Sequence, residues 1–548
     1  FDKNDLGVKS TPYQDPTERV WWRPFGVAAA VSVLSLFAFL ALLVSPFLLA
    51  FATVRHFYFA TASFKRQPST CRIAVIGGGW NGLQIVRRLQ ERGVEDITCY
   101  EKGDDVGGTW HPDKRYANLK LHSPAWSVQF KDFLYGRSFE ERSSRIPGKH
   151  LHDYMRSFAD NFDLRKYFVL NSTVVQIESD SSKRKAVLQV ASTIDGSVVQ
   201  QTEPFDMVIF ASLAGKPVIP IIGNESEFGG ETLHASALSQ DKWKQLIEEN
   251  KKVVVVGGSK SSCDTVLSFV DYVPDENIIW LYRRPYHFMK YEDFCHNRDF
   301  IHKIGGLLHL LCFSLAALAP ALAWRLMMWL GFTYTYDMKD WKNDWETYRF
   351  GVLDRLQRSI LTKFPNKVRG EILCFTPTGI ILKNGDAIEC DVVIWATGYT
   401  GGLEDIKLVK DETEFKMPMK MKLYNGAIVP TFPELLIGSS IPITTGPKGS
   451  LLAADLSIYQ LCVQANLSEE QMLKSAQRNH HIVDNNQSVL FRPGFWNTFS
   501  SYFISMLMMG MLPIVGFVKH YALFMVFGRQ DEPLEPGILP ASPLRKNT

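Results

Sequence analysis

The stretch Cys71–Lys102, CRIAVIGGGWNGLQIVRRLQERGVEDITCYEK, sets the fold class of this chain. Residues Arg72–Ile76 form a short apolar run that ends at glycine, which predicts a buried parallel strand. Gly77, Gly79 and Gly82 follow with the spacing G-x-G-x-x-G. In a dinucleotide-binding turn the first glycine allows the tight bend, the second admits a pyrophosphate, and the third lets a helix pack on the strand.

The residues after these glycines complete the same pattern. A helix is expected from Gly82 to about Arg92, and its N-terminal amides would point at the phosphates. The next strand, Ile97–Tyr100, ends in Glu101, a carboxylate that can accept hydrogen bonds from ribose hydroxyls. Strand, glycines, helix, strand and acid in register predict a first dinucleotide-binding unit.

An altered copy of the pattern lies further along the chain. Val253–Val256 is the expected strand, Gly257 the first glycine, and Lys260–Val270 the expected helix. Serines, Ser259 and Ser262, occupy the second and third glycine positions. Because serine is small, the turn is expected to survive, and the sequence predicts a second dinucleotide-binding unit.

The nucleotide of this second unit is expected to carry a 2′-phosphate. The strand Ile278–Tyr282 ends in Arg283 and Arg284 with no acid, and arginine can grip a phosphate in a bidentate fork. Lys260 opens the preceding helix and could neutralise phosphate as well. These charges favour NADPH over NADH. The alternative is that the two arginines are a solvated surface pair.

Composition narrows the function classes. With 548 residues the chain is long enough for about three to four units, and the net charge of +3 gives no reason to expect nucleic acid as a partner. The eight cysteines contain no C-x-x-C pair, so both a redox disulfide and a zinc site lack their spacing signal. No metal site is predicted, and scattered thiols fit a reducing compartment.

Three apolar stretches indicate a membrane. Phe25–Val54 contains no charged side chain and exceeds the roughly 20 residues of a transmembrane helix, whereas a cleaved signal peptide would be shorter and nearer the first residue. The Lys/Arg excess after it places the rest of the chain in the cytosol, on the endoplasmic reticulum or another organelle. Ile304–Phe332 and Tyr502–Val518 read as interfacial anchors. The alternative is that they are buried elements of the soluble fold.

Five motifs together resemble the class B flavin monooxygenases, over about Cys71 to Cys462. They are the GGGWNG turn at Gly77, Gly107-Gly108-Thr109-Trp110, Phe228-x-Gly230-x-x-x-His234, the turn at Gly257, and Trp395-Ala396-Thr397-Gly398-Tyr399. The Lys260-Ser261-Ser262-x-Asp264 turn and the apolar insertion are similar to plant and fungal members. The resemblance implies an α/β fold with two nested Rossmann-like domains, to which the sequence adds an N-terminal transmembrane helix and membrane-contacting segments.

The resemblance also implies a chemistry. NADPH reduces FAD, dioxygen forms a C4a-peroxyflavin, and this species oxygenates a small lipophilic substrate in a dry pocket. The alternative is a flavin-binding subunit of a membrane assembly with weak or no turnover. Its partner would then be another membrane protein or, in a homo-oligomer, further copies of the same chain. The serines at the second turn and the membrane-contacting segments keep this alternative open.

His122 is the candidate catalytic residue. Many flavin-containing monooxygenases have an asparagine near the flavin in a segment that matches Tyr116–Phe133, and the alignment places His122 there. Plant members also have histidine. Two roles stay open, a structural donor beside the flavin ring and a group that transfers protons. Two further departures are Leu238, where an aromatic is usual, and Ala211-Ser212-Leu213 in place of a small-Thr-Gly exit.

The acid-started strands FDMVIFAS (Phe205–Ser212) and CDVVIWATG (Cys390–Gly398) are expected to carry the chain out of and back into the FAD domain. The predicted order is a tail (1–24), a transmembrane helix (25–54), a first FAD-binding segment (70–214), an NADP-binding domain (215–387, with the apolar insertion 304–332), a second FAD-binding segment (388–475) and a C-terminal membrane-associated region (476–548). The expected cofactor-binding residues are Gly77, Gly78, Gly79, Trp80, Asn81, Gly82, Glu101, Lys102, Gly108, Thr109, Trp110, Leu121, His122, Val174, Thr397 and Gly398 for FAD, and Gly257, Ser259, Lys260, Ser261, Ser262, Arg283 and Arg284 for NADPH.

Overall fold

The computed structural model describes residues 65–484, apart from 123–124, 126–128, 131–132, 134, 137–144, 197–198, 213–214, 292–319, 330, 332, 338–347, 418–419, 425–426, 439–447, 464–467 and 479–481. The predicted transmembrane helix, most of the apolar insertion and the last apolar stretch lie outside the described residues. Among the residues that are described, no helix combines the length and apolar character that a membrane crossing needs.

The first predicted unit forms a six-stranded sheet with the order β22-β23-β7-β1-β2-β3. The predicted strand–helix–strand is confirmed as β1 (Arg72–Ile76), α2 (Trp80–Glu91) and β2 (Asp96–Tyr100). β1 runs parallel to both β2 and β7, and β23 runs parallel to β7. The other strands are β3 (Phe168–Val169), β7 (Met207–Phe210), β22 (Ile428–Val429) and β23 (Phe432–Ile437). Since β22 and β23 come from the last part of the described chain, the second unit is inserted within the first.

The second unit forms a five-stranded sheet with the order β14-β10-β9-β18-β8, in which all described pairs are parallel. Its predicted elements are confirmed as β9 (Val253–Val256), α6 (Lys260–Phe269) and β10 (Ile278–Tyr282). The remaining strands are β8 (Glu231–His234), β14 (Lys367–Arg369) and β18 (Val392–Trp395). Because β18 pairs with β9, the second unit extends beyond the predicted boundary at residue 387, and the chain returns to the first unit only after β18.

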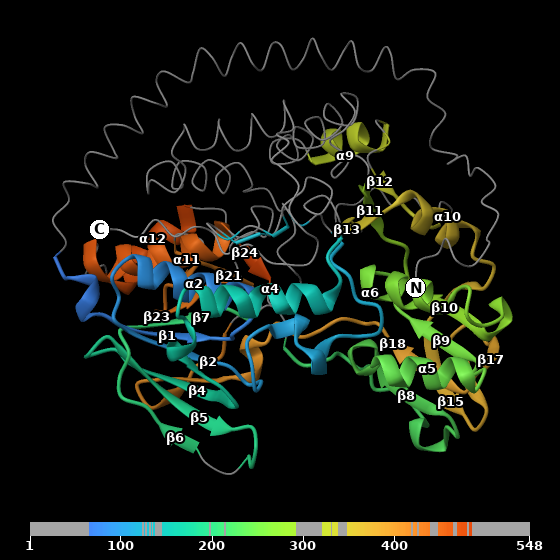
Figure 1. Cartoon of the computed structure of the whole chain (residues 1–548), viewed down its shortest axis with the longest axis horizontal. Helices are drawn as coiled ribbons and strands as arrows, with labels where there is room; N and C mark the ends of the chain where they lie inside the picture. The colour runs from blue at the N-terminus through green and yellow to red at the C-terminus, as the bar shows by residue number, and fades with distance from the viewer. Residues whose placement is uncertain are drawn as a thin grey trace, which may run out of the picture.

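Smaller sheets and helices cover the two main sheets (Figure 1). A five-stranded sheet, β20-β19-β4-β5-β6, belongs to the first lobe, and the three-stranded sheets β12-β11-β13 and β15-β16-β17 belong to the second. Their strands are β4 (Ser172–Asp180), β5 (Lys185–Ser192), β6 (Val199–Gln201), β11 (His287–Lys290), β12 (Thr333–Tyr334), β13 (Tyr348–Leu353), β15 (Ile372–Thr376), β16 (Gly379–Leu382), β17 (Ala387–Glu389), β19 (Lys407–Lys410) and β20 (Thr413–Glu414). A short pair joins β21 (Lys420–Lys422) to β24 (Ile482–Asp484), and the helices are α4 (Gly148–Asn161), α5 (Gln240–Glu248), α9 (Pro320–Trp329), α10 (Arg355–Lys363), α11 (Lys448–Ile458) and α12 (Glu469–Arg478).

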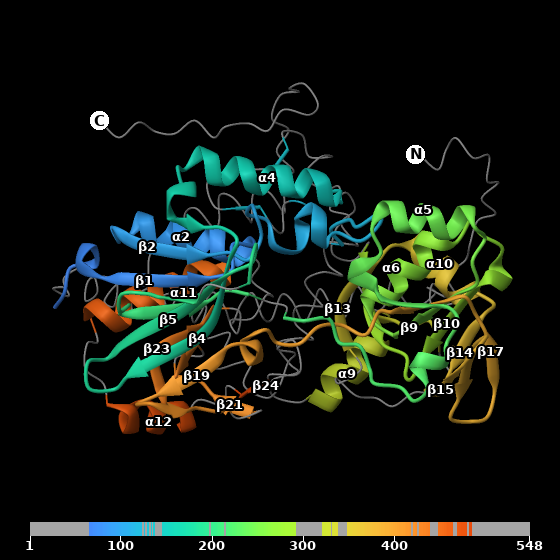
Figure 2. The ribbon, with the colours of Figure 1, turned by 90° about the horizontal axis from the view of Figure 1, so that it is seen from below.

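Each lobe has its own core. In the first lobe, side chains of the central strand alternate between the two faces of the sheet. In β1, Ile73 and Val75 pack on the side of α2, α4 and α11, while Ala74 and Ile76 pack beneath the β4–β5 sheet. Figure 2 shows the two lobes side by side, with β1 and β2 in one and β9 and β10 in the other. Both nucleotide turns therefore lie at the carboxyl ends of central parallel strands, where ligands of open α/β sheets bind.

The described helix of the apolar insertion, α9, has one buried side and one exposed side. In α9, Trp324 and Met327 are buried, and the Trp324 ring stands edge-on to His287 of β11 at 5.1 Å between centroids. Leu322 and Trp329 of the same helix are 51% and 60% exposed. One side of α9 thus belongs to the folded lobe, as the alternative interpretation of this stretch expected, and the other side presents apolar surface.

Candidate functional site

The first glycine turn has the close packing that its spacing predicts. Gly77 has φ +104°, a conformation that favours glycine. A Cβ added at Gly82 would lie 1.9 Å from the Gly77 carbonyl oxygen, so only glycine lets α2 approach β1 this closely. Gly79 caps α2 without a side-chain hydrogen bond. The first amides of α2 therefore keep their donors directed at the turn, as an anion-binding helix terminus requires.

Glu101 lies where the sequence predicts it, at the end of β2, and it is buried. Its Oε2 accepts from the amide of Gly78 at 2.6 Å, and its Oε1 accepts from the amide of Gly103 at 2.8 Å. Lys114 lies 3.4 Å from Oε1. These contacts hold the carboxylate beside the glycine turn, in the position of a ribose acceptor.

The Gly107–Trp110 motif folds against the same turn. The Gly107 amide donates to the carbonyl of Gly78 at 3.1 Å, and Gly107 has φ +138°. A Cβ added at Gly108 would come within 2.9 Å of the Gly79 Cα. Thr109 is exposed and Trp110 is partly buried. The two glycine segments thus form one backbone-lined cradle with no room for side chains between them.

Other predicted FAD residues contribute backbone or packing. The Trp80 ring lies 4.4 Å from that of Phe130, in an aromatic cluster, so its amide is the group at the turn. Asn81 donates to the Ala211 carbonyl at 3.3 Å and accepts from Ser450 at 2.8 Å, which ties β7 and α11 to the turn. Lys102 is exposed, and Leu121 and Val174 are buried in the first lobe.

The second turn accommodates its serines. Gly257 has φ +147°, and a Cβ there would lie 2.4 Å from the carbonyl oxygen of Ala396. Ser262 is fully buried, and its hydroxyl donates to the Ser259 carbonyl at 2.7 Å. Ser259 caps α6 without a side-chain hydrogen bond, which leaves the first amides, including that of Ser261, at the helix terminus. The replacement of two glycines has therefore not removed the turn.

Lys260 is held differently from the prediction. Its ammonium pairs with Asp264 one helical turn later, and Tyr116 donates to the other oxygen of Asp264 at 3.1 Å. The Lys260 charge is thus shared with a carboxylate in this structure. The spacing of four residues between Lys260 and Asp264 is the one that brings helical side chains together, so this pair could have been found from the sequence.

Arg283 and Arg284 point in different directions after β10. The Arg283 side chain is 69% exposed and lies 3.9 Å from Glu371. Arg284 donates to the Tyr286 hydroxyl at 3.3 Å, and its guanidinium lies 5.4 Å from the centre of that ring. A Cβ added at Gly258 would meet the Arg284 carbonyl at 2.6 Å. The predicted pair is therefore split, with Arg284 beside the glycine turn and Arg283 at the outer edge.

His122 lies near the second turn, in surroundings that favour its neutral form. Burial lowers the pKa of His122 to about 4, and the positive charges of Lys260 and Arg145 act in the same direction, while Asp264 opposes them. These neighbouring charges indicate that His122 lies at the boundary between the two lobes.

His234, the histidine of the third motif, contacts the segments through which the chain passes between the two lobes. His234 accepts from the Ser236 amide at Nδ1, and its Nε2 lies 3.0 Å from the Gly398 carbonyl oxygen, so its neutral Nε2–H form fits both contacts. Burial lowers the pKa of His234, which favours that form. Thr397 donates to the Val218 carbonyl, and the Val218 amide donates to Gly398 at 3.0 Å. The outgoing and returning segments are thereby paired.

The matching family model is named flavin-binding monooxygenase-like, and it covers residues 70–443. This range contains both glycine turns and both paired crossing segments. The chain belongs to this family.

The individual proteins that are similar to this chain have low sequence identity to it. A probable flavin-containing monooxygenase 1 of Arabidopsis thaliana is 25% identical over 432 residues, which are 68% of this chain and 79% of that one. A 4-hydroxybenzoate brominase (decarboxylating) of Marinomonas mediterranea is 30% identical over 216 residues, 39% of each chain. The chain spans less than half the length of the first curated relatives it matches. Among solved structures, OTEMO in complex with FAD and NADP has a TM-score of 0.51 at 16% identity, covering 71% of this chain and 85% of that one, which supports the shared fold.

Sequence reasoning missed three residues of this flavin-binding monooxygenase-like chain that lie at its second site. Tyr116 donates to Asp264, which is 148 positions later in the chain, Arg145 pairs with Asp354 at 3.0 Å, and Arg369 ends β14 beside Arg283. No local pattern marks them, because each acts through a partner that is distant along the chain.

Proposed function

We propose that this protein is an NADPH- and FAD-dependent monooxygenase that oxygenates a small lipophilic substrate at a membrane. The observation that carries the proposal is the pair of glycine turns, at Gly77 and Gly257, each at the carboxyl end of a central strand in one of two nested sheets. Two such turns suit two dinucleotides, and membership of the flavin-binding monooxygenase-like family supports FAD as one of them.

The residues of the first turn fit FAD. The cradle between Gly77–Gly82 and Gly107–Gly108 leaves backbone amides for a pyrophosphate, and Glu101 lies beside it to accept from ribose hydroxyls. When bound, a flavin supplies hydride acceptance from NADPH and activation of dioxygen. The chain's own role is to bind, to orient and to exclude water. Neutral His122 can donate or accept a hydrogen bond without adding charge.

Flavin content tests the first site. Gly82→Ala places a Cβ 1.9 Å from the Gly77 carbonyl, so α2 must move off β1 and the cradle opens. We expect a loss of about 1–3 kcal/mol in folding stability and most of the bound FAD. The measurements are flavin absorbance per protein and thermal unfolding. In the control, Gly223→Ala, the new Cβ meets only Cys374 at 3.9 Å and the Leu373 carbonyl at 4.0 Å, and FAD should stay bound. Full flavin occupancy in Gly82→Ala would show that the cofactor lies elsewhere.

Reduction of the flavin distinguishes an active enzyme from an inactive flavin-binding subunit. We expect NADPH to reduce bound FAD in lipid-embedded protein, and oxygen to reoxidise it with transfer of one oxygen atom to substrate. Stopped-flow absorbance follows both half-reactions. If neither NADPH nor NADH reduces the flavin, the alternative of a weakly active or inactive flavin-binding subunit is the better one. The satisfied hydroxyl of Ser262 supports the active enzyme, since the altered turn keeps its geometry.

The membrane aspect of the proposal rests on the sequence. The uncharged run Phe25–Val54 supports an anchor with the two lobes facing the cytosol, and the exposed Leu322 and Trp329 of α9 offer a second apolar contact. Deletion of residues 1–54 should weaken attachment without abolishing it, whereas high salt should not release the full chain. Flotation with vesicles measures both. Complete solubility of the truncated chain would mean that neither later apolar stretch, Ile304–Phe332 or Tyr502–Val518, contacts lipid.

A further inference from the structure

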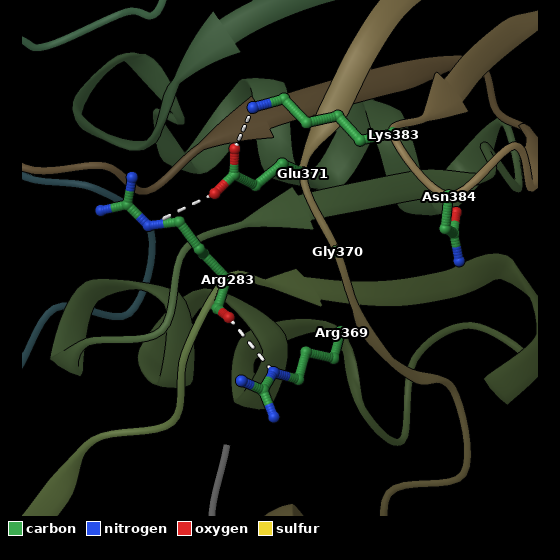
Figure 3. A pocket seen from close by; sticks show the side chains of 6 residues that line it. All are labelled: Arg283, Arg369, Gly370, Glu371, Lys383 and Asn384. Carbon is green, nitrogen blue, oxygen red and sulfur yellow. Dashed lines mark hydrogen bonds and ion pairs between the residues drawn. The ribbon is translucent and has the colours of Figure 1, made fainter. Parts of the chain in front are cut away.

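A pocket of about 470 Å³ opens at the outer edge of the second sheet, where β10 and β14 end. Tyr282 of β10 and Arg369 of β14 are register partners, so Arg283 and Arg369 leave neighbouring strand ends together. Arg369 also donates to the Arg283 carbonyl at 3.4 Å. The pocket is lined by Arg283, Arg369, Gly370, Glu371, Lys383 and Asn384 (Figure 3).

The pocket has a positive excess. Three of its side chains are cations, Arg283, Arg369 and Lys383, and the one acid is Glu371. Glu371 pairs with Lys383 and lies 3.9 Å from Arg283. Figure 3 shows these two ion-pairing side chains reaching Glu371 from opposite sides. The arrangement matches a dianion that can replace Glu371 as their partner.

We propose that Arg369 and Lys383, with Arg283, recognise the 2′-phosphate of NADPH, and that Arg284 does not. The inference rests on the proposed function, since it names the determinants of nucleotide choice at the same site. Sheet order supports it, because a nucleotide bound at the Gly257 turn places its ribose at the end of the next strand, β10. The neighbour of β10 on the side away from β9 is β14, which carries Arg369.

The contacts of Arg284 explain its exclusion. Its guanidinium lies against the Tyr286 ring, whereas the residues that line the pocket are Arg283, Arg369, Gly370, Glu371, Lys383 and Asn384. Glu371 has the opposite role to the arginines, because its carboxylate repels a phosphate and competes with it for Arg283 and Lys383. Removing that charge should therefore improve phosphate binding, an effect that a merely structural surface cluster would not show.

Binding of two nucleotide fragments tests the inference without turnover. The FAD-loaded full chain is titrated by calorimetry with adenosine 2′,5′-bisphosphate and with adenosine 5′-monophosphate, which lacks the 2′-phosphate. The wild type should prefer the bisphosphate. Arg369→Ala should weaken bisphosphate binding about tenfold and leave the monophosphate unchanged, as expected for one charge-assisted contact. Glu371→Gln should strengthen bisphosphate binding several-fold.

Two further variants sharpen the test. Lys251→Ala removes an exposed cation of the same lobe, paired with Glu249, and should change neither fragment. Arg284→Ala should leave the bisphosphate preference unchanged. The inference is overturned if the wild type has no preference, or if Arg284→Ala abolishes the preference while Arg369→Ala keeps it. In either case, reduction of the flavin by NADPH or NADH would leave the proposed oxidoreductase function standing, whereas reduction by neither would remove that function itself.

Discussion

At the scale of single residues, the protonation of His122 makes a prediction about pH. Its pKa is lowered to about 4 in the folded chain, against an unfolded value near 6.5. Above pH 6.5 both states are neutral and nothing is lost. As the pH falls from 6.5 to 4, the unfolded chain takes up the proton first, so folding stability declines. We expect His122→Gln to lose less stability over this window, measured by thermal unfolding at a series of pH values.

His287 provides the internal reference for that experiment. Burial lowers its pKa to about 4 as well, and it remains in both proteins, so the difference between the two curves isolates His122. Parallel curves would mean that His122 is not held neutral. The same neutrality explains why His122 can sit beside the positive charges of Lys260 and Arg145, since an imidazolium there would meet like charge.

At the scale of elements, one carboxylate joins α2 to α11. Asp455 of α11 is buried and receives Arg88 at 2.9 Å and Arg92 at 2.6 Å, the first from α2 and the second from its C-cap. Asp455→Asn would leave the buried Arg88 with Glu91 as its described partner, at 3.0 Å. We expect the free energy of unfolding to fall by about 3 kcal/mol, because breaking a buried ion pair leaves a buried charge without its partner. Chemical denaturation measures it.

An exposed pair supplies the comparison at this scale. Asp160 pairs with Arg165 at the surface, where its side chain is 57% exposed. Asp160→Asn should cost less than about 1 kcal/mol, because solvent screens such pairs. Equal losses in the two variants would show that α11 does not depend on Asp455. The physical distinction is burial, as the chemistry of the two acids is the same.

At the scale of the whole molecule, Arg145 helps to hold the lobes in register. It pairs with Asp354 at 3.0 Å and with Gln357 at 3.1 Å, at the start of α10 in the second lobe. We expect Arg145→Met to keep FAD content but to slow flavin reduction by NADPH several-fold, because hydride transfer needs the two nucleotides aligned. Stopped-flow absorbance measures the rate. Lys149→Met, at an exposed position of α4, is the control and should leave it unchanged. Unaltered reduction in Arg145→Met would show that other contacts set the lobe orientation.

The two strand–glycine–helix–strand units follow from the sequence alone. β1, β9 and β10 begin and end at the predicted residues, and the helices α2 and α6 differ from prediction by at most two residues at either end. These units could be predicted because their information is local. Glycine spacing, a short apolar run and a helix within about 30 residues specify a turn whose geometry depends on near neighbours alone.

Which side chains meet depends instead on how the separate elements pack. β18 joined the second sheet and not the first, Arg283 and Arg284 diverged, and Arg369 arrived beside Arg283. Cys71 and Cys462, scattered in sequence, came to lie 3.6 Å apart. Each of these outcomes follows from strand order and from the return of the chain into the first sheet. Contacts between residues hundreds of positions apart leave no periodicity in the sequence, because they form only when separate strands and helices pack together.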